Sequence, residues 1–204
     1  KKMSKSLGNI VDPWEEMEKY GIDAIRLWMY SVNQPGESKN YDGKTVDEIN
    51  KKVFNLLGNV FSFYDLYRDK TLEWDHVPES SHALDQWIML KLSMLTSEIT
   101  DSLESYKLLE PVRAMREFID DLSTWYLQLS RDRVREGDAG AKQTLFYVLK
   151  TLSKLLAPFA PFYAEDLYQK LRTASDVESV HLESWPHFAE ATRGEPQNSK
   201  LLED

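Results

Sequence analysis

The sequence of 204 residues contains no cysteine. This absence excludes disulfide bonds and thiol catalysis, and it removes the thiolate ligands of the usual zinc sites. The histidines, His76, His82, His181 and His187, do not share the regular spacing that places metal ligands on a common helix. We therefore interpret them as surface or capping residues and predict no metal site.

Long apolar runs and an excess of positive charge are also missing. No apolar stretch approaches the roughly 20 residues that a helix needs to cross a bilayer, so we expect no membrane partner. The formal net charge is −9, which weakens nonspecific attraction to nucleic-acid phosphates. RNA binding would have to come from a local basic surface. With 42% hydrophobic and 29% charged residues, the composition is that of a folded globular chain rather than a disordered one.

The spacing of apolar residues predicts an all-α fold. Apolar side chains recur at steps of three and four in successive segments, as in amphipathic helices. These segments are residues 44–68, 83–105, 108–135, 141–156 and 161–171. The stripe of the third is the most regular, and its members are Leu108, Val112, Met115, Ile119, Leu122, Tyr126 and Leu129. We expect Gly137 and Gly140 to break this helix and the prolines near 158–161 to separate the last two. Long helices with short connections should pack as a bundle.

A short segment of loop and helices should precede the bundle. Asp12 and Pro13 favour a helix start, because aspartate is a preferred N-cap and proline fits the first helical position. Gly21 should end that helix, Asp23 should cap the next one, and Arg26 on it should form a structural salt bridge.

The domain organisation follows from turn-forming and polar stretches. Turn formers gather at residues 33–43, which we interpret as a loop and a domain boundary. We divide the chain into a junction segment (1–43), a helical bundle (44–186) and a linker (187–204). Apolar and polar residues alternate over 177–186, which predicts a short extended segment at the end of the bundle.

The first residues have the chemistry of a phosphate-binding loop. Lys2, Ser4, Lys5 and Ser6 place two lysines three residues apart among hydroxyl groups. Lysine carries a compact charge with three donors on a flexible stem, so it can follow a phosphate as its charge changes. For so short a motif the alternative is a solvated basic turn.

A second basic cluster ends the third long helix and consists of Arg131, Arg133 and Arg135. Arginine makes planar, bidentate contacts with phosphates and stacks on bases, so this helix end could hold an RNA loop. The alternative is a purely local role, because cations at a helix C-terminus interact favourably with the dipole by roughly 0.3 to 1 kcal/mol each.

Several longer motifs resemble those of class I aminoacyl-tRNA synthetases. The string K-M-S-K-S-L-G-N-I-V-D-P at residues 2–13, with residues 20–28, resembles the second signature of that class and the helix pair after it. Residues 121–133, 155–168 and 179–186 resemble hallmarks of the isoleucyl, valyl and leucyl branch. The resemblance covers nearly the whole chain and implies that the bundle is an anticodon-binding domain, where unstacked bases are read by stacking and edge hydrogen bonds.

The resemblance also implies roles for individual residues. Lys5, with Lys2, Ser4 and Ser6, would contact the triphosphate of ATP, and Arg131, Arg133 and Arg135 would contact tRNA. Trp125 and Tyr126 could stack on bases, but an aromatic residue on a helix stripe is more often in the core, and we favour the core for both.

Within this branch, the sequence looks most like the isoleucyl-tRNA synthetases. Leu7 argues against the leucyl type, and residues 32–37 and 180–186 favour the isoleucyl type over the valyl type, with the methionyl type less similar. Such an enzyme is a cytoplasmic monomer that joins isoleucine to its tRNA with ATP and Mg²⁺. Its nucleotide-binding domain would precede residue 1, so we expect no complete catalytic site, no bound cofactor and no adenylation by this chain alone. The rival hypothesis is a helical interaction module without RNA binding.

Overall fold

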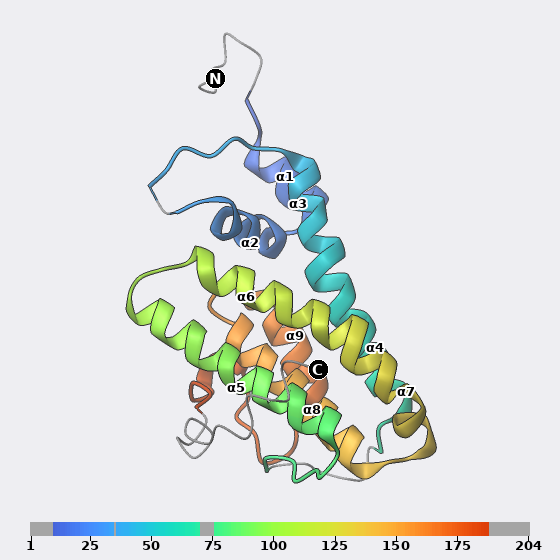
Figure 1. Ribbon diagram of the computed structural model, residues 1–204. Coiled ribbons are helices and arrows are strands. Elements are labelled where there is room, and N and C mark those ends of the chain that lie inside the picture. Colours follow the sequence, from blue (N-terminus) through green and yellow to red (C-terminus); the bar gives the residue numbers. More distant parts are fainter. Residues whose placement is uncertain (1–9, 35, 70–75, 188–204) are drawn as a thin grey trace.

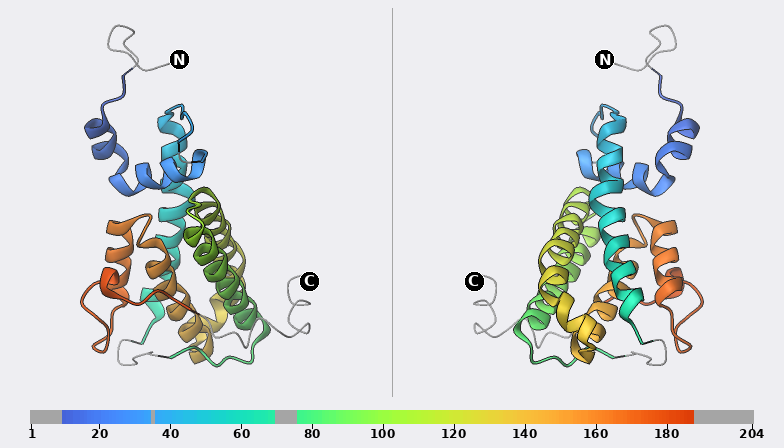
Figure 2. Two further views of the ribbon diagram at one scale, coloured as in Figure 1. Left: turned by 90° about the vertical axis from the view of Figure 1, so that its left-hand side faces the viewer. Right: turned by 90° about the vertical axis from the view of Figure 1, so that its right-hand side faces the viewer.

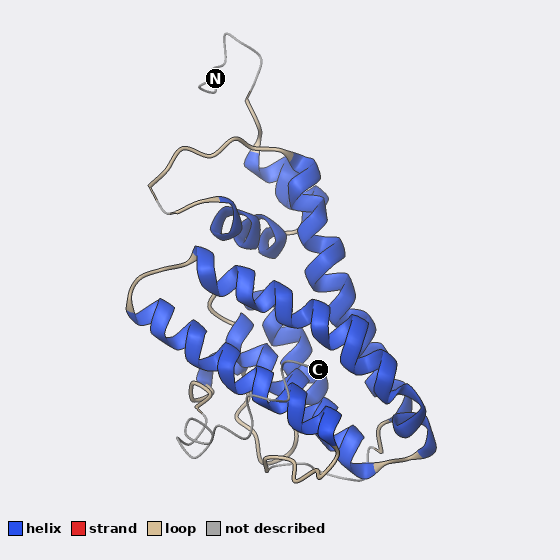
Figure 3. Ribbon diagram, in the orientation of Figure 1, coloured by secondary structure: helices blue, strands red, loops and turns tan. Residues whose placement is uncertain are grey.

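The computed structural model describes residues 10–34, 36–69 and 76–187, and helices dominate this part of the chain (Figures 1 and 3). No strand occurs in these three ranges. In chain order the elements are α1 (Pro13–Tyr20), α2 (Ile22–Val32), α3 (Gly43–Ile49), the π turn η2 (Asn50–Phe54), α4 (Asn55–Tyr67), α5 (Ala83–Glu104), α6 (Leu109–Asp120), the π turn η3 (Asp121–Tyr126), α7 (Leu127–Glu136), α8 (Ala139–Leu156), α9 (Pro161–Leu171) and the 3₁₀ turn η4 (Val180–Leu182). The predicted all-α bundle, with a loop-and-helix segment before it, is confirmed.

The start of α1 follows the prediction. The Asp12 carboxylate accepts the Trp14 backbone N–H at 2.8 Å, and Pro13 is the first helical residue. Gly21 ends α1 with a backbone φ of 85°, a value that residues other than glycine rarely adopt.

Asp23 caps a different helix from the one predicted. It lies inside α2, is buried, and accepts the backbone N–H of Tyr163 at 2.6 Å. Tyr163 is the third residue of α9, whose own N-cap residue, Ala160, makes no side-chain hydrogen bond. An acceptor is needed there because the first N–H groups of a helix have no partner within it. Asp23 therefore supplies from α2 the cap that α9 lacks.

Arg26 holds the other side of the same turn. Its Nε donates to the carbonyl of Phe159 at 3.2 Å and its Nη2 donates to that of Pro158 at 3.1 Å. The expected salt bridge is thus replaced by contacts with carbonyls of the turn between α8 and α9. One helix, α2, places a negative charge at the start of α9 and a positive charge beyond the end of α8, as the helix dipoles favour.

Two long, continuous helices carry π turns. One runs through α3, η2 and α4, and the other through α6, η3 and α7 (Figure 1). Figure 2 shows the first of them extending beside the rest of the bundle from the side of α1 to the opposite end. A π turn contains more residues than an α-helical turn, so it shifts which side chains face the core. After η3 the buried residues of α7 are Leu127, Ser130 and Val134, whereas Leu129 is exposed. The predicted place of Leu129 on the core stripe is therefore wrong.

The core forms around α8, which packs against α5, α7, α4 and α9. Residues of α2, including Leu27 and Trp28, belong to the same buried cluster. Gly137 ends α7 as predicted, with a φ of 94°. Gly140 breaks nothing, because α8 begins one residue earlier and the Asp138 carboxylate caps it by accepting the Ala141 N–H at 3.0 Å.

The segment after α9 is not extended as predicted. It is held as irregular chain by side chains of α8 and α5: Lys150 pairs with Asp176 at 2.6 Å, and the Trp185 indole donates to Thr100 Oγ1 at 2.9 Å. Ser179 Oγ accepts the His181 N–H and starts the short turn η4. Alternating hydrophobicity produces a strand only where a neighbouring strand can take its hydrogen bonds, and the described residues provide none. The division into three segments stays a prediction.

Candidate nucleic-acid interface

The predicted phosphate-binding residues, Lys2, Ser4, Lys5 and Ser6, lie outside the described residues. The candidate interface that the structure describes is therefore the end of α7, where the sequence predicts Arg131, Arg133 and Arg135 as RNA contacts.

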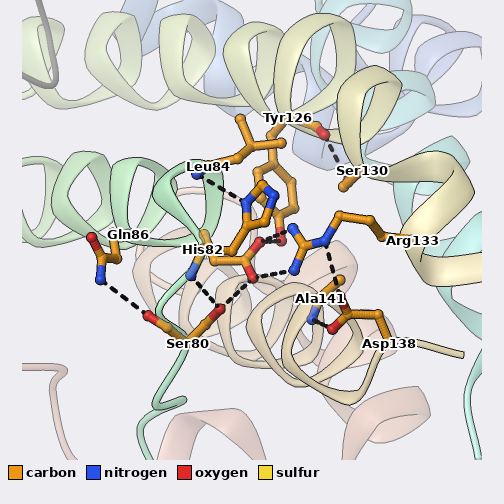
Figure 4. A network of polar contacts seen from close by, with 10 residues as sticks. Ser80, His82, Leu84, Gln86, Tyr126, Ser130, Arg133, Asp138 and Ala141 are labelled. Atoms are coloured by element: carbon orange, nitrogen blue, oxygen red, sulfur yellow. Dashed lines mark hydrogen bonds and ion pairs between the residues drawn. The ribbon is translucent and has the colours of Figure 1, made fainter.

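Arg133 is occupied by contacts within the protein. Its Nη1 and Nη2 bind the two carboxylate oxygens of Asp85, on α5, at 2.9 and 2.8 Å, and its Nε binds Asp138 at 3.0 Å. Figure 4 shows the guanidinium directed at this cluster, between Tyr126 and Asp138. Ser80 and Tyr126 donate to the same Asp85 carboxylate at 2.7 and 2.9 Å. The Arg133 side chain ties the end of α7 to the start of α5 and is unavailable as a free phosphate ligand.

The electrostatics of this cluster favour its ionised form. Burial raises the pKa of Asp85, but hydrogen bonds from Arg133, Ser80 and Tyr126 outweigh it, so its pKa lies below the ordinary value. The hydrogen bond with Asp85 raises the pKa of Arg133 above its usual range. Burial, with the nearby Asp85 charge, raises the pKa of Tyr126 as well. The tyrosine therefore stays a neutral donor and the carboxylate and guanidinium stay charged at neutral pH.

Arg131 and Arg135 face outward instead. The Arg131 guanidinium lies 5.6 Å from the centre of the Phe63 ring on α4, a cation–π arrangement, and the residue is exposed. Arg135 pairs only loosely with Asp132, at 3.5 Å between exposed side chains. Exposed pairs of this kind contribute little stability, so a phosphate can replace the partner. These two arginines can meet RNA, while the third fixes the helix that carries them.

Trp125 and Tyr126 have opposite environments. Tyr126 is fully buried, as predicted, but Trp125 is 53% exposed, so the expectation of a core position for it is wrong. Both residues lie in η3, where Tyr126 is buried and Trp125 is not. An exposed indole on the same continuous helix as Arg131 is a flat surface on which a base can stack. Trp125 lies one position before Tyr126 and therefore off the apolar stripe of Leu122 and Tyr126, which was the signal in the sequence for its exposure.

The remaining polar clusters of the described residues do not form a metal site. No group of three or more histidine, aspartate or glutamate side chains in the described part of the chain could hold a metal ion. His82 is the N-cap of α5, its Nδ1 accepting the Leu84 N–H at 3.2 Å. None of the described helices combines the length and the hydropathy of a transmembrane span.

Family models match two parts of the chain. "Anticodon-binding domain of tRNA ligase" matches residues 85–203, and "tRNA synthetases class I (I, L, M and V)" matches residues 1–42. The first range begins within α5, at the Asp85 that binds Arg133, and includes α6 to α9.

Curated relatives are longer proteins. The chain is 38% identical over 202 residues to an isoleucine–tRNA ligase of Clostridium tetani, covering 93% of the chain and 19% of that protein. It is 40% identical over 195 residues to the enzyme of the same name from Porphyromonas gingivalis, covering 91% of the chain and 17% of that protein. The chain thus spans about a fifth of the length of the curated relatives it matches.

A solved structure shares the fold. The LeuRS of Agrobacterium radiobacter K84, crystallised in a ternary complex with tRNA and LeuAMS, superposes with a TM-score of 0.76 at 22% identity, over 94% of this chain and 23% of that one. At this identity the likeness concerns the arrangement of the helices alone.

Proposed function

Because the chain belongs to the family of anticodon-binding domains of tRNA ligases, we propose that it binds the anticodon region of a tRNA through the exposed side of α7. The observation that carries this proposal is the coincidence of the matched range with the helices that present Arg131 and Arg135 to solvent. Trp125, which lies in η3 directly before α7, would stack on an unpaired base of the same loop. The predicted role of Arg133 becomes indirect: it holds α7 in place.

We infer that the whole protein is an isoleucine–tRNA ligase, which uses ATP and Mg²⁺ to join isoleucine to its tRNA through an adenylate. The class I model over residues 1–42 and the names of the relatives support this. Lys5, with Lys2, Ser4 and Ser6, would hold the triphosphate. A valine–tRNA ligase of the same branch is the alternative. We propose a monomer that acts in the cytoplasm.

A titration of fluorescently labelled isoleucine tRNA with the chain tests the proposal. Binding should weaken steeply between about 50 and 200 mM salt, because cations of the protein displace counterions from the phosphates. At a given salt concentration, Arg131→Glu and Arg135→Glu should each bind tRNA more weakly than the unchanged chain. Arg172→Glu, at the exposed end of α9, should bind it equally well. Absence of binding at the lower salt concentration would instead favour a helical module without an RNA role.

Specificity needs a second comparison. Valine tRNA and isoleucine tRNA, offered as unlabelled competitors, differ in the anticodon that the domain should read. Stronger competition by isoleucine tRNA supports the isoleucine assignment, and stronger competition by valine tRNA supports the alternative.

A further inference from the structure

We propose that Lys52, Arg113 and Arg116 form a second phosphate-binding site, which holds the sugar–phosphate backbone of the tRNA away from the anticodon. This inference rests on the proposed tRNA binding and adds a contact that neither the family models nor the relatives' names assign.

The three side chains surround one hollow on the surface. It measures about 420 Å³ and lies between η2, which carries Lys52, and α6, which carries the arginines. Its lining residues are Lys52, Arg113, Arg116, Glu117 and Asp120. Arg113 and Arg116 are three residues apart on α6, so their side chains project from neighbouring positions on one side of the helix.

Within the described residues, the two arginines lack the partners that Arg26 and Arg133 have. Arg26 binds two carbonyls and Arg133 binds two carboxylates. Neither Arg113 nor Arg116 has a hydrogen bond, ion pair or ring contact anywhere in the described part of the chain. Arg116 is also half-buried, and removing an unpaired charge from water is unfavourable unless an anion offsets the loss. An external anion supplies that missing partner.

Lys52 is free to join them. Its only ion pair within the described residues is with Glu48 at 3.8 Å, and both side chains are 55% exposed. A pair so long and so exposed contributes almost nothing to stability, so the ammonium can turn to a stronger ligand.

The acidic residues in the lining decide which kind of phosphate fits. Glu117 and Asp120 offset two of the three positive charges, so a free phosphate ion should bind weakly. A phosphate that belongs to a tRNA already held at α7 arrives at a high effective concentration, and a weak local site is then enough. The charge balance therefore favours a polymer over a small anion.

The position of the hollow matches that requirement. Arg116 and Arg131 lie on one continuous helix, 15 positions apart in the sequence, which is roughly 22 Å of helix length. Both face the same neighbour, the long helix α3–η2–α4: Arg116 meets Lys52 across the hollow, and Arg131 covers Phe63. A stem-loop whose loop binds at Arg131 can therefore lay its stem along this helix pair and reach Arg116.

The salt dependence of tRNA binding tests the proposal with the double variant Arg113→Gln/Arg116→Gln. Each lost phosphate contact lowers the slope of log affinity against log salt by about 0.9, so the slope should fall by roughly 2. The affinity loss relative to the unchanged chain should then be roughly tenfold larger at 50 than at 200 mM salt. Lys52→Gln should reproduce half of the slope change. Arg172→Gln, which removes an exposed arginine elsewhere, is the matched control and should leave the slope unchanged.

Separate outcomes distinguish this inference from the proposed function. If the unchanged chain binds tRNA and the double variant keeps its slope, the second site is refuted and anticodon binding stands. If the unchanged chain binds no tRNA, both fail. A titration with sodium pyrophosphate, followed by NMR of the arginine Nε–H groups, covers the remaining case: saturation by pyrophosphate without tRNA binding would overturn the RNA assignment. Circular dichroism of each variant confirms folding, and Lys52→Gln alone carries the test if the double variant unfolds.

Discussion

Replacing Asp85 by asparagine should lower the free energy of unfolding by about 3 kcal/mol, because one partner of a buried ion pair is removed. Asp85 is only 1% exposed, and the guanidinium of Arg133 binds both of its oxygens. Loss of one buried partner typically costs about 3 to 5 kcal/mol. The lower end applies here, since the asparagine oxygen still accepts one bond and Arg133 keeps Asp138.

Urea unfolding at neutral pH, followed by circular dichroism, measures this loss. The comparison includes Asp85→Asn, Arg133→Gln and the double variant, so that a double-mutant cycle isolates the pair. Each single variant should lose more than half of the unfolding free energy that the double variant loses, because either single change leaves the other residue of the pair without its partner. A loss below about 1 kcal/mol in Asp85→Asn, or purely additive effects, would refute a buried pair as the device that holds α7 to α5.

The same variant should respond to pH in a defined direction. The folded-state pKa of Asp85 lies below its ordinary value, so its contribution is present above that ordinary value and is lost as the pH falls through the folded-state pKa. The stability difference between the unchanged chain and Asp85→Asn should be constant near neutral pH and shrink below roughly pH 4. A difference that widened toward acid pH would contradict the assigned direction of the pKa shift.

Two further predictions concern the backbone and the α2 contact. Gly137→Ala should destabilise the chain by about 1 kcal/mol, because Gly137 has a φ of 94°. Gly58→Ala should stabilise it by a few tenths to 1 kcal/mol, because Gly58 lies inside α4 and an added Cβ would meet only Tyr163 Oη, at 3.6 Å. Thermal unfolding should show stability changes of opposite sign for the two variants, and changes of the same sign would contradict this reasoning. Asp23→Ala should lower the free energy of unfolding by about 1 to 2 kcal/mol, because the Tyr163 N–H at the start of α9 loses its acceptor. Asp23→Asn should lower it less, because the asparagine oxygen can still accept that N–H. Equal losses of the two variants in urea unfolding would show that this hydrogen bond contributes nothing.

Helix positions and family resemblance could be predicted because they depend on local sequence. Proline and glycine end or start the helices near the expected residues, and α9 has the predicted bounds. The resemblance to class I aminoacyl-tRNA synthetases is confirmed by the two family matches. The π turns escaped prediction, because apolar spacing at three and four residues continues through η3. The shift appears in the structure as buried Leu127 and Ser130 and exposed Leu129.

The candidate site was harder to predict, because it depends on residues far apart in the sequence. Arg131, Arg133 and Arg135 look equivalent in the sequence, yet Arg133 is taken by Asp85, 48 positions away. Arg26 and Asp23 likewise bind a turn more than 130 positions distant. Partners at such separations leave no periodic signal, so a cluster of like residues cannot be divided into structural and binding members before the fold is known.

The net charge of −9 and a role in RNA binding are compatible because of where the cations lie. Acidic residues such as Asp23, Asp85 and Asp176 receive backbone or cationic donors inside the bundle, so part of the negative charge is matched within the fold. Arg116 and Arg131 stay available along one pair of helices. Repulsion of RNA by the net negative charge and direct binding of RNA by a line of cations can coexist. At physiological salt the repulsion is screened beyond about 8 Å, whereas an ion pair in direct contact with a phosphate is screened much less. Binding should therefore depend on that line of cations more than on total charge.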